Sequence, residues 1–125
     1  MRGGALLDNG RTADVEHMPL PGLPEIHSAF AALVYVPKET LTIEGTTKTF
    51  TSPGGSGKPM LRYFCPECGS TIAQEPGTRP ELVVVHVGTL DDPKSVTPAR
   101  EIFCDDALPW VQTIGDMRKF ARRPV

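Results

Sequence analysis

Two cysteines separated by two residues are the first feature of this sequence that can do chemistry. Cys65 and Cys68 stand in the stretch RYFCPECGS. A structural zinc ion takes four ligands, almost always Cys or His, and a Cys-x-x-Cys loop supplies two of them. Pro66 stiffens the turn, and Gly69 allows the positive φ that lets backbone donors point at the sulfurs. The motif predicts that Cys65 and Cys68 are metal ligands, as half of a zinc site.

Two other interpretations of this pair stay open. A thioredoxin-like redox pair would stand at the start of a helix that follows a βαβ pattern, and the sequence shows no such pattern. The pair could also be two packed thiols that hold no metal.

One further cysteine and three histidines complete the set of soft metal ligands. We expect Cys104, in IFCDD, to be a small core residue, because free Cys is among the most buried residue types. His86, inside VVVHVG, fits a satisfied or half-exposed strand residue better than a ligand. His17 and His27 flank a proline-rich segment and could reach a metal only through loop placement.

Length and charge narrow the class of protein. The 125 residues fit a single domain, here 1–125. A net charge of -2 gives no basic surface for a phosphate backbone, so we expect no nucleic-acid partner. No segment resembles a secretory signal or a membrane span, which predicts a cytoplasmic protein without membrane association. In that compartment a Cys-x-x-Cys pair stays reduced and favours metal binding or redox chemistry.

Short apolar or alternating segments, separated by Gly and Pro, predict a mainly β fold with little helix. The strongest strand is ELVVVHVGTL, whose run of β-branched residues indicates burial on both faces. Gly-rich residues 53–59 suit a flexible loop, either a hairpin tip or a mobile edge. The expected strands cover residues 29–37, 41–44, 47–52, 60–64, 70–75, 81–90 and 101–104. We therefore predict six or seven short antiparallel strands in one small domain.

The two ends of the chain are predicted to differ from this pattern. Residues 1–27 show no sustained periodicity, and MPLPGLPE, residues 18–25, holds three prolines that exclude a helix interior or a central strand. Residues 1–27 are therefore expected to be irregular. Residues 107–125 are expected to hold one or two helical turns.

The order of SAFAALVYVP, FCPECGS, VVHVGTLDDP and IFCDDALPW resembles the family of glutathione-dependent formaldehyde-activating enzymes and centromere protein V. The resemblance covers about residues 28–112. It implies an Mss4-like β fold, of the β-tent type, with two zinc sites. One is structural, from an N-terminal Cys-x-Cys and the later Cys-x-x-Cys, here Cys65 and Cys68. The other is catalytic, from a Cys-His-Cys-x-x-Cys segment shortly before Ala29.

The implied activity is that of a carbon–sulfur lyase acting on adducts of a small thiol with an aldehyde, such as S-hydroxymethylglutathione. This chain contains neither the N-terminal Cys-x-Cys nor the Cys-His-Cys-x-x-Cys. We therefore expect an incomplete structural zinc site, a lost catalytic zinc and an impaired enzyme, and we assign no catalytic residue. The alternative is a non-enzymatic zinc-knuckle scaffold or a degenerate family member.

A shifted reading frame offers an explanation for the missing catalytic motif. MPLPGLPE is encoded by ATG CCN CTN CCN GGN CTN CCN GAR if both leucines use the CTN set. Dropping the first base allows Cys-His-Cys-Arg-Asp-Cys-Gln, where the motif is expected. The hypothesis is that residues 18–26 arise from a shifted frame, with a compensating insertion or deletion before Ser28. The coding DNA tests it, because other synonymous codons would not spell this peptide.

Overall fold

The computed structural model describes residues 4–6, 12–17, 29–53, 57–112 and 117–121. These residues contain ten strands and four short 3-10 segments but no α-helix, which confirms the mainly β prediction. The strands are β1 (Gly4–Leu6), β2 (Thr12–His17), β3 (Phe30–Pro37), β4 (Thr42–Glu44), β5 (Lys48–Pro53), β6 (Pro59–Phe64), β7 (Thr71–Pro76), β8 (Leu82–His86), β9 (Thr97–Ile102) and β10 (Arg118–Lys119). The 3-10 segments are η1 (Lys38–Thr40), η2 (Val87–Thr89), η3 (Pro93–Ser95) and η4 (Cys104–Asp106).

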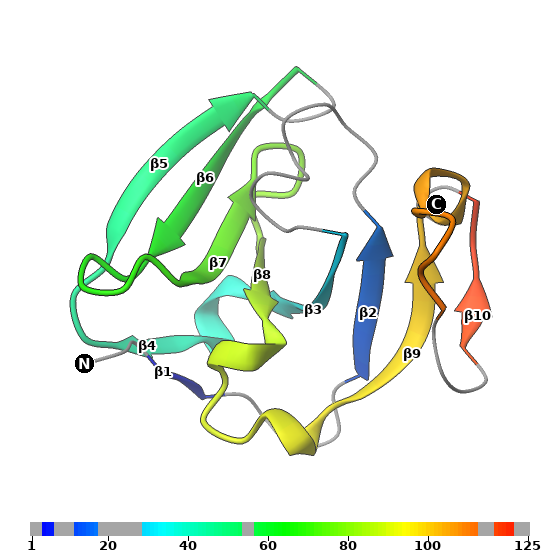
Figure 1. Ribbon diagram of the computed structural model, residues 1–125. Helices are drawn as coiled ribbons and strands as arrows, with labels where there is room; N and C mark the ends of the chain where they lie inside the picture. The colour runs from blue at the N-terminus through cyan, green and yellow to red at the C-terminus, as the bar shows by residue number, and fades with distance from the viewer. Residues whose placement is uncertain (1–3, 7–11, 18–28, 54–56, 113–116, 122–125) are drawn as a thin grey trace.

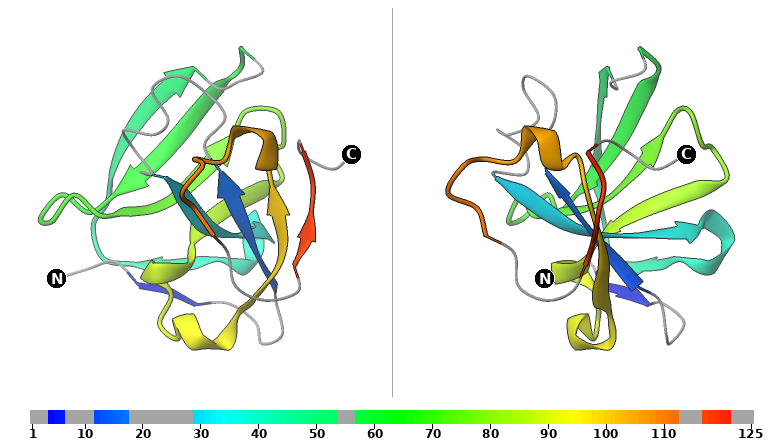
Figure 2. Two further views of the ribbon diagram at one scale, coloured as in Figure 1. Left: turned by 45° about the vertical axis from the view of Figure 1, so that its right-hand side comes forward. Right: turned by 90° about the vertical axis from the view of Figure 1, so that its right-hand side faces the viewer.

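Eight of the described strands form one sheet in the order β10-β9-β2-β3-β8-β7-β6-β5, and β1 pairs with β4 separately. The sheet is strongly twisted, so β5 and β6 run at a steep angle to β2 and β9 (Figure 1 and Figure 2). The pairings β2–β9 and β9–β10 are parallel. The expectation of antiparallel strands alone was therefore wrong on this side of the sheet. A long crossover, the chain through β3 to β8, separates β2 from β9, as parallel pairing requires.

The core lies around the adjacent central strands β3 and β8. Three consecutive residues of β8, Val83, Val84 and Val85, are each at most 3% exposed, which confirms burial on both faces. Across the pairing, Val34 and Val36 of β3 are also buried. β3 pairs with β2 and β8 pairs with β7, so the central strands position the ends of both neighbours.

Three predicted boundaries need correction. The strand predicted to end at Leu90 ends at His86, because η2 follows it directly. The strand predicted over residues 101–104 begins at Thr97 and ends at Ile102. Phe103 causes the early end, because its left-handed conformation (φ 56°, ψ 40°) turns the chain out of the sheet.

The two ends of the chain also differ from the prediction. Residues 1–27 are not irregular throughout, because β1 and β2 lie within them. Strand β2 escaped detection because its buried positions include the polar residues Asp14 and His17. Near the C-terminus, β10 pairs with β9 where helical turns were expected. Residues 113–116 and 122–125 lie outside the described residues, as do residues 18–28, where the shifted frame was inferred.

Candidate functional site

The Cys-x-x-Cys motif forms the turn that joins β6 to β7. The N–H of Cys65 donates to the carbonyl of Ser70 (2.9 Å), and the N–H of Gly69 donates to the carbonyl of Cys65 (2.8 Å). Gly69 has a φ of 76°, as the sequence predicted. Two backbone hydrogen bonds and one left-handed glycine thus fix the turn from Cys65 to Ser70, which we call the knuckle.

The two sulfurs of the knuckle differ in their surroundings. Cys65 is 3% exposed and belongs to the core cluster, whereas Cys68 is exposed. Cys68 Sγ lies 3.2 Å from Ser70 Oγ. The pKa of Cys68 is lowered, first by the side-chain hydrogen bond with Ser70, then by the Ser70 backbone and by Cys65. This environment favours the thiolate, the form of cysteine that binds metal and attacks electrophiles.

The knuckle fits half of a zinc site. Its sulfurs come from one tight turn, and the thiolate of Cys68 is stabilised before any ion binds. Among the described residues, a single group of three or more His, Cys, Asp or Glu side chains has ligand atoms within 4.8 Å of one another, and it does not include Cys65 or Cys68. The assignment of both cysteines as zinc ligands stays a prediction.

A hollow of about 480 Å³ lies next to the knuckle. It is bordered on one side by Ser70 and Thr71, where the knuckle enters β7, and on the other by His86 and Gly88 at the end of β8. The remaining lining residues are Phe30, Ala31, Ala32, Val87 and Thr89. His86 is half-exposed, as expected, but the sequence did not reveal that it shares a hollow with the knuckle, because β7 and β8 pair only in the fold.

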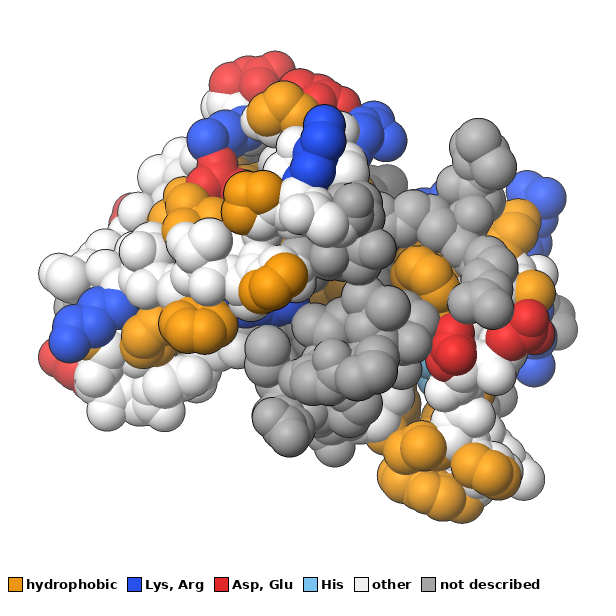
Figure 3. Space-filling view, turned by 90° about the horizontal axis from the view of Figure 1, so that it is seen from above, with side chains coloured by type: hydrophobic (Ala, Val, Ile, Leu, Met, Phe, Trp, Pro, Cys, Tyr) orange, Lys and Arg blue, Asp and Glu red, His pale blue; other side chains and the backbone are white. Residues whose placement is uncertain are grey.

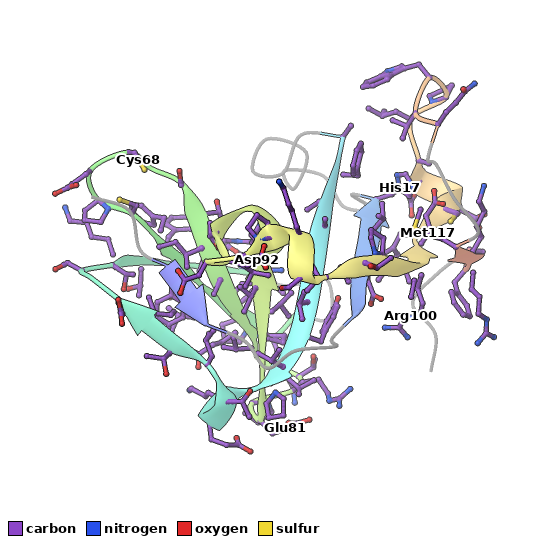
Figure 4. All side chains as sticks on the ribbon, turned by 90° about the horizontal axis from the view of Figure 1, so that it is seen from below. His17, Cys68, Glu81, Asp92, Arg100 and Met117 are labelled. Atoms are coloured by element: carbon purple, nitrogen blue, oxygen red, sulfur yellow. The ribbon has the colours of Figure 1, made fainter. Side chains whose placement is uncertain are left out.

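A second cluster of chemically active side chains lies elsewhere. His17 of β2, Glu101 of β9 and Cys104 of η4 each place a ligand atom within 4.8 Å of the other two. His17 and Cys68 lie on opposite sides of the molecule (Figure 4), so this cluster is separate from the knuckle. His17 is fully buried rather than in a loop, and Cys104 is only partly buried. Glu101 was not a sequence candidate, and no local signal marks it, because its partner His17 is 84 positions away. His27 lies outside the described residues.

The chain matches the model of a known protein family. The family model of glutathione-dependent formaldehyde-activating enzyme matches residues 25–106, about two thirds of the chain and including the knuckle and the hollow. The chain belongs to this family. At the family level its function is therefore connected with glutathione and the activation of formaldehyde. No curated protein matches the chain.

Two observations concern membranes and nucleic acid as partners of this protein. None of the helical segments in the described residues is long and apolar enough to cross a membrane. On the face shown in Figure 3, the described basic and acidic side chains are interspersed and form no continuous basic patch. That the protein has no nucleic-acid partner, does not associate with membranes and is cytoplasmic stays a prediction from the sequence.

Proposed function

We propose that this chain is an impaired carbon–sulfur lyase that still binds adducts of glutathione with formaldehyde or a similar small aldehyde. One observation carries the proposal: the residues that match the family contain an intact knuckle with a hollow beside it. The reaction joins the thiol sulfur to the carbonyl carbon, while the thiol proton passes to the carbonyl oxygen. The reverse reaction breaks the same carbon–sulfur bond and releases both components.

The lining of the hollow suits such a ligand. Ser70 and Thr71 offer hydroxyl groups that can hydrogen-bond to a hydroxymethyl group or to a peptide amide. His86 is another lining residue of the hollow, and its Nε2 is buried. These lining residues support the proposal that the hollow binds the adduct.

The family's catalytic zinc does not fit this chain. The sequence contains three cysteines, and none lies between residues 18 and 26, where the catalytic motif is expected. Two of the three form the knuckle and the third is Cys104. We therefore assign no step to a catalytic zinc, and we attribute the impaired activity to the loss of its ligands.

A variant that fills the hollow tests the binding part of the proposal. A side-chain Cβ at Gly88 would meet no atom within 4 Å, so Gly88→Leu can be built without a backbone clash and would occupy the hollow. The matched control is Thr51→Leu, because Thr51 lines a different hollow, which β5, β6 and β7 border. With S-methylglutathione as the probe, ligand-observed NMR should show binding to the unaltered chain and to Thr51→Leu, but not to Gly88→Leu. Equal binding of S-methylglutathione to both variants, or no binding to the unaltered chain, would overturn the assignment of the hollow as the binding site.

The alternative function is a non-enzymatic scaffold that uses the knuckle alone. The exposure of Cys68 favours this alternative. It predicts that S-methylglutathione binds neither the unaltered chain nor either variant. A redox protein is the third class. It would form a reversible disulfide between Cys65 and Cys68, whereas zinc-bound thiolates would resist thiol reagents until the metal is chelated.

A further inference from the structure

Parallel pairing of β2 with β9 brings three metal-ligating side chains together inside the protein. Val15 aligns with Glu101 and Glu16 with Ile102, so His17 lies just beyond the aligned end of β9. His17 Nε2 lies 2.6 Å from Glu101 Oε1. One ligand atom each from His17, Glu101 and Cys104 lies within 4.8 Å of the other two.

The turn after β9 places the sulfur of this cluster. Phe103 adopts a left-handed conformation that is uncommon for a bulky residue and begins η4. The N–H of Cys104 donates to the carbonyl of Phe120 (3.0 Å), which fixes the position of Cys104. The Cys104 sulfur then lies 3.4 Å from the carbonyl oxygen of Glu101, close to the side chains of His17 and Glu101.

The imidazole of His17 is only partly satisfied. The side chain is fully buried, and Nδ1 has no hydrogen-bond partner among the described residues. A neutral imidazole carries one donor and one acceptor nitrogen, so the bond between Nε2 and Glu101 accounts for one of the two. Buried polar atoms without a partner are rare in folded proteins, so the hydrogen bonding of His17 is incomplete as it stands.

We propose that His17, Glu101 and Cys104 bind one divalent transition-metal ion of the zinc type. Zinc accepts imidazole nitrogen, carboxylate oxygen and thiolate sulfur, and this cluster offers one of each. Glu101 and a deprotonated Cys104 carry two negative charges, which a divalent cation neutralises. The thiol proton of Cys104 passes to solvent when the sulfur bonds to the metal. Bonds of about 2.0 to 2.3 Å to one ion place tetrahedral ligand atoms more than about 3 Å apart. His17 Nε2 and Glu101 Oε1, now 2.6 Å apart, therefore separate slightly to admit the ion.

The three cysteines of the chain allow this site to be separated from the knuckle. The double variant Cys65→Ala/Cys68→Ser leaves Cys104 as the sole cysteine. Alanine suits the buried position and serine the exposed one. Cobalt(II) is the probe, because its bond to thiolate gives a charge-transfer absorption that imidazole and carboxylate do not give. We expect the double variant to bind one cobalt ion with this absorption.

Two changes in that background decide the assignment. His17→Gln should abolish the absorption, and Glu101→Gln should weaken cobalt binding by at least about 10-fold, because losing a ligand costs no less than losing a residue that orients one. The proposal would be overturned if the folded double variant showed no thiolate–cobalt absorption. It would also be overturned if neither His17→Gln nor Glu101→Gln changed that absorption. As a second measurement that keeps all three cysteines, His17→Gln in the unaltered chain should lower the cobalt bound per chain by one ion, and an unchanged count would also overturn it.

Discussion

Asp14 and Arg100, aligned on the parallel strands β2 and β9, form a two-point ion pair. Arg100 donates from Nε to Oδ1 (2.8 Å) and from Nη2 to Oδ2 (2.5 Å). The Asp14 side chain is 5% exposed, whereas that of Arg100 is 41% exposed. The pKa of Arg100 is raised, first by its hydrogen bonds to Asp14. This pair fixes the register of the side of the sheet that carries His17 and Glu101.

Replacing Asp14 with Asn should destabilise the fold. The amide keeps the shape of the side chain but loses the charge that both guanidinium bonds require, so we expect a loss of about 1.5–3 kcal/mol in the free energy of unfolding. Urea denaturation measures it. Glu81→Gln is the control, because its ion pair with Arg79 is exposed on both sides and should leave the urea midpoint unchanged. Equal effects of the two changes would contradict the structural role of Asp14.

The left-handed glycine of the knuckle should be costly to replace. An added Cβ at Gly69 would meet no atom within 4 Å, so the cost of Gly69→Ala comes from the backbone alone. We expect a loss of about 1–2 kcal/mol. Gly88 has equally open surroundings without a positive φ, so Gly88→Ala should be neutral or stabilise by up to about 1 kcal/mol. Thermal or urea unfolding that ranks the two variants in the opposite order would refute this explanation.

The three cysteines of the metal-free protein should react with iodoacetamide at different rates. Cys68 should react first, because it is exposed and its thiolate is stabilised by Ser70. Cys104 should react slowly, because burial raises its pKa. Mass spectrometry of timed samples gives the order. Ser70→Ala should slow the reaction of Cys68 and leave that of Cys104 unchanged, and a faster reaction at Cys104 would contradict the assignment.

The hydrogen bond between Tyr63 and Glu75 should appear in the alkaline titration. Burial raises the pKa of Tyr63 to about 12, and the bond to Glu75 acts in the same direction. The folded protein therefore holds a proton that the unfolded chain releases near the ordinary tyrosine pKa of 10.0, so stability should fall as the pH rises from 10.0 to about 12. Ultraviolet absorbance of the phenolate measures the pKa. Tyr63→Phe should remove the high transition and Tyr35→Phe should keep it, whereas the reverse result would assign it to Tyr35.

The local parts of the fold could be predicted from the sequence. Strands β3 and β8 follow from runs of Val and Leu, and the knuckle follows from the spacing of its Cys and Gly residues, because these signals lie within a few positions of one another. Strand β2 could not be found in this way. Its buried residues Asp14 and His17 are polar, and their partners Arg100 and Glu101 lie 86 and 84 positions away. The cluster of His17, Glu101 and Cys104 escaped prediction for the same reason.

The rate of adduct formation tests the central claim most directly. Two-dimensional exchange NMR on formaldehyde and glutathione measures how fast S-hydroxymethylglutathione forms and breaks down. With zinc present, we predict that the unaltered chain leaves this rate at its uncatalysed value. We predict that the variant Met18→Cys/Pro19→His/Leu20→Cys/Leu23→Cys, which restores Cys-His-Cys-x-x-Cys, raises it. An increase by the unaltered chain as large as that by the restored variant would contradict the claim that its lyase activity is impaired.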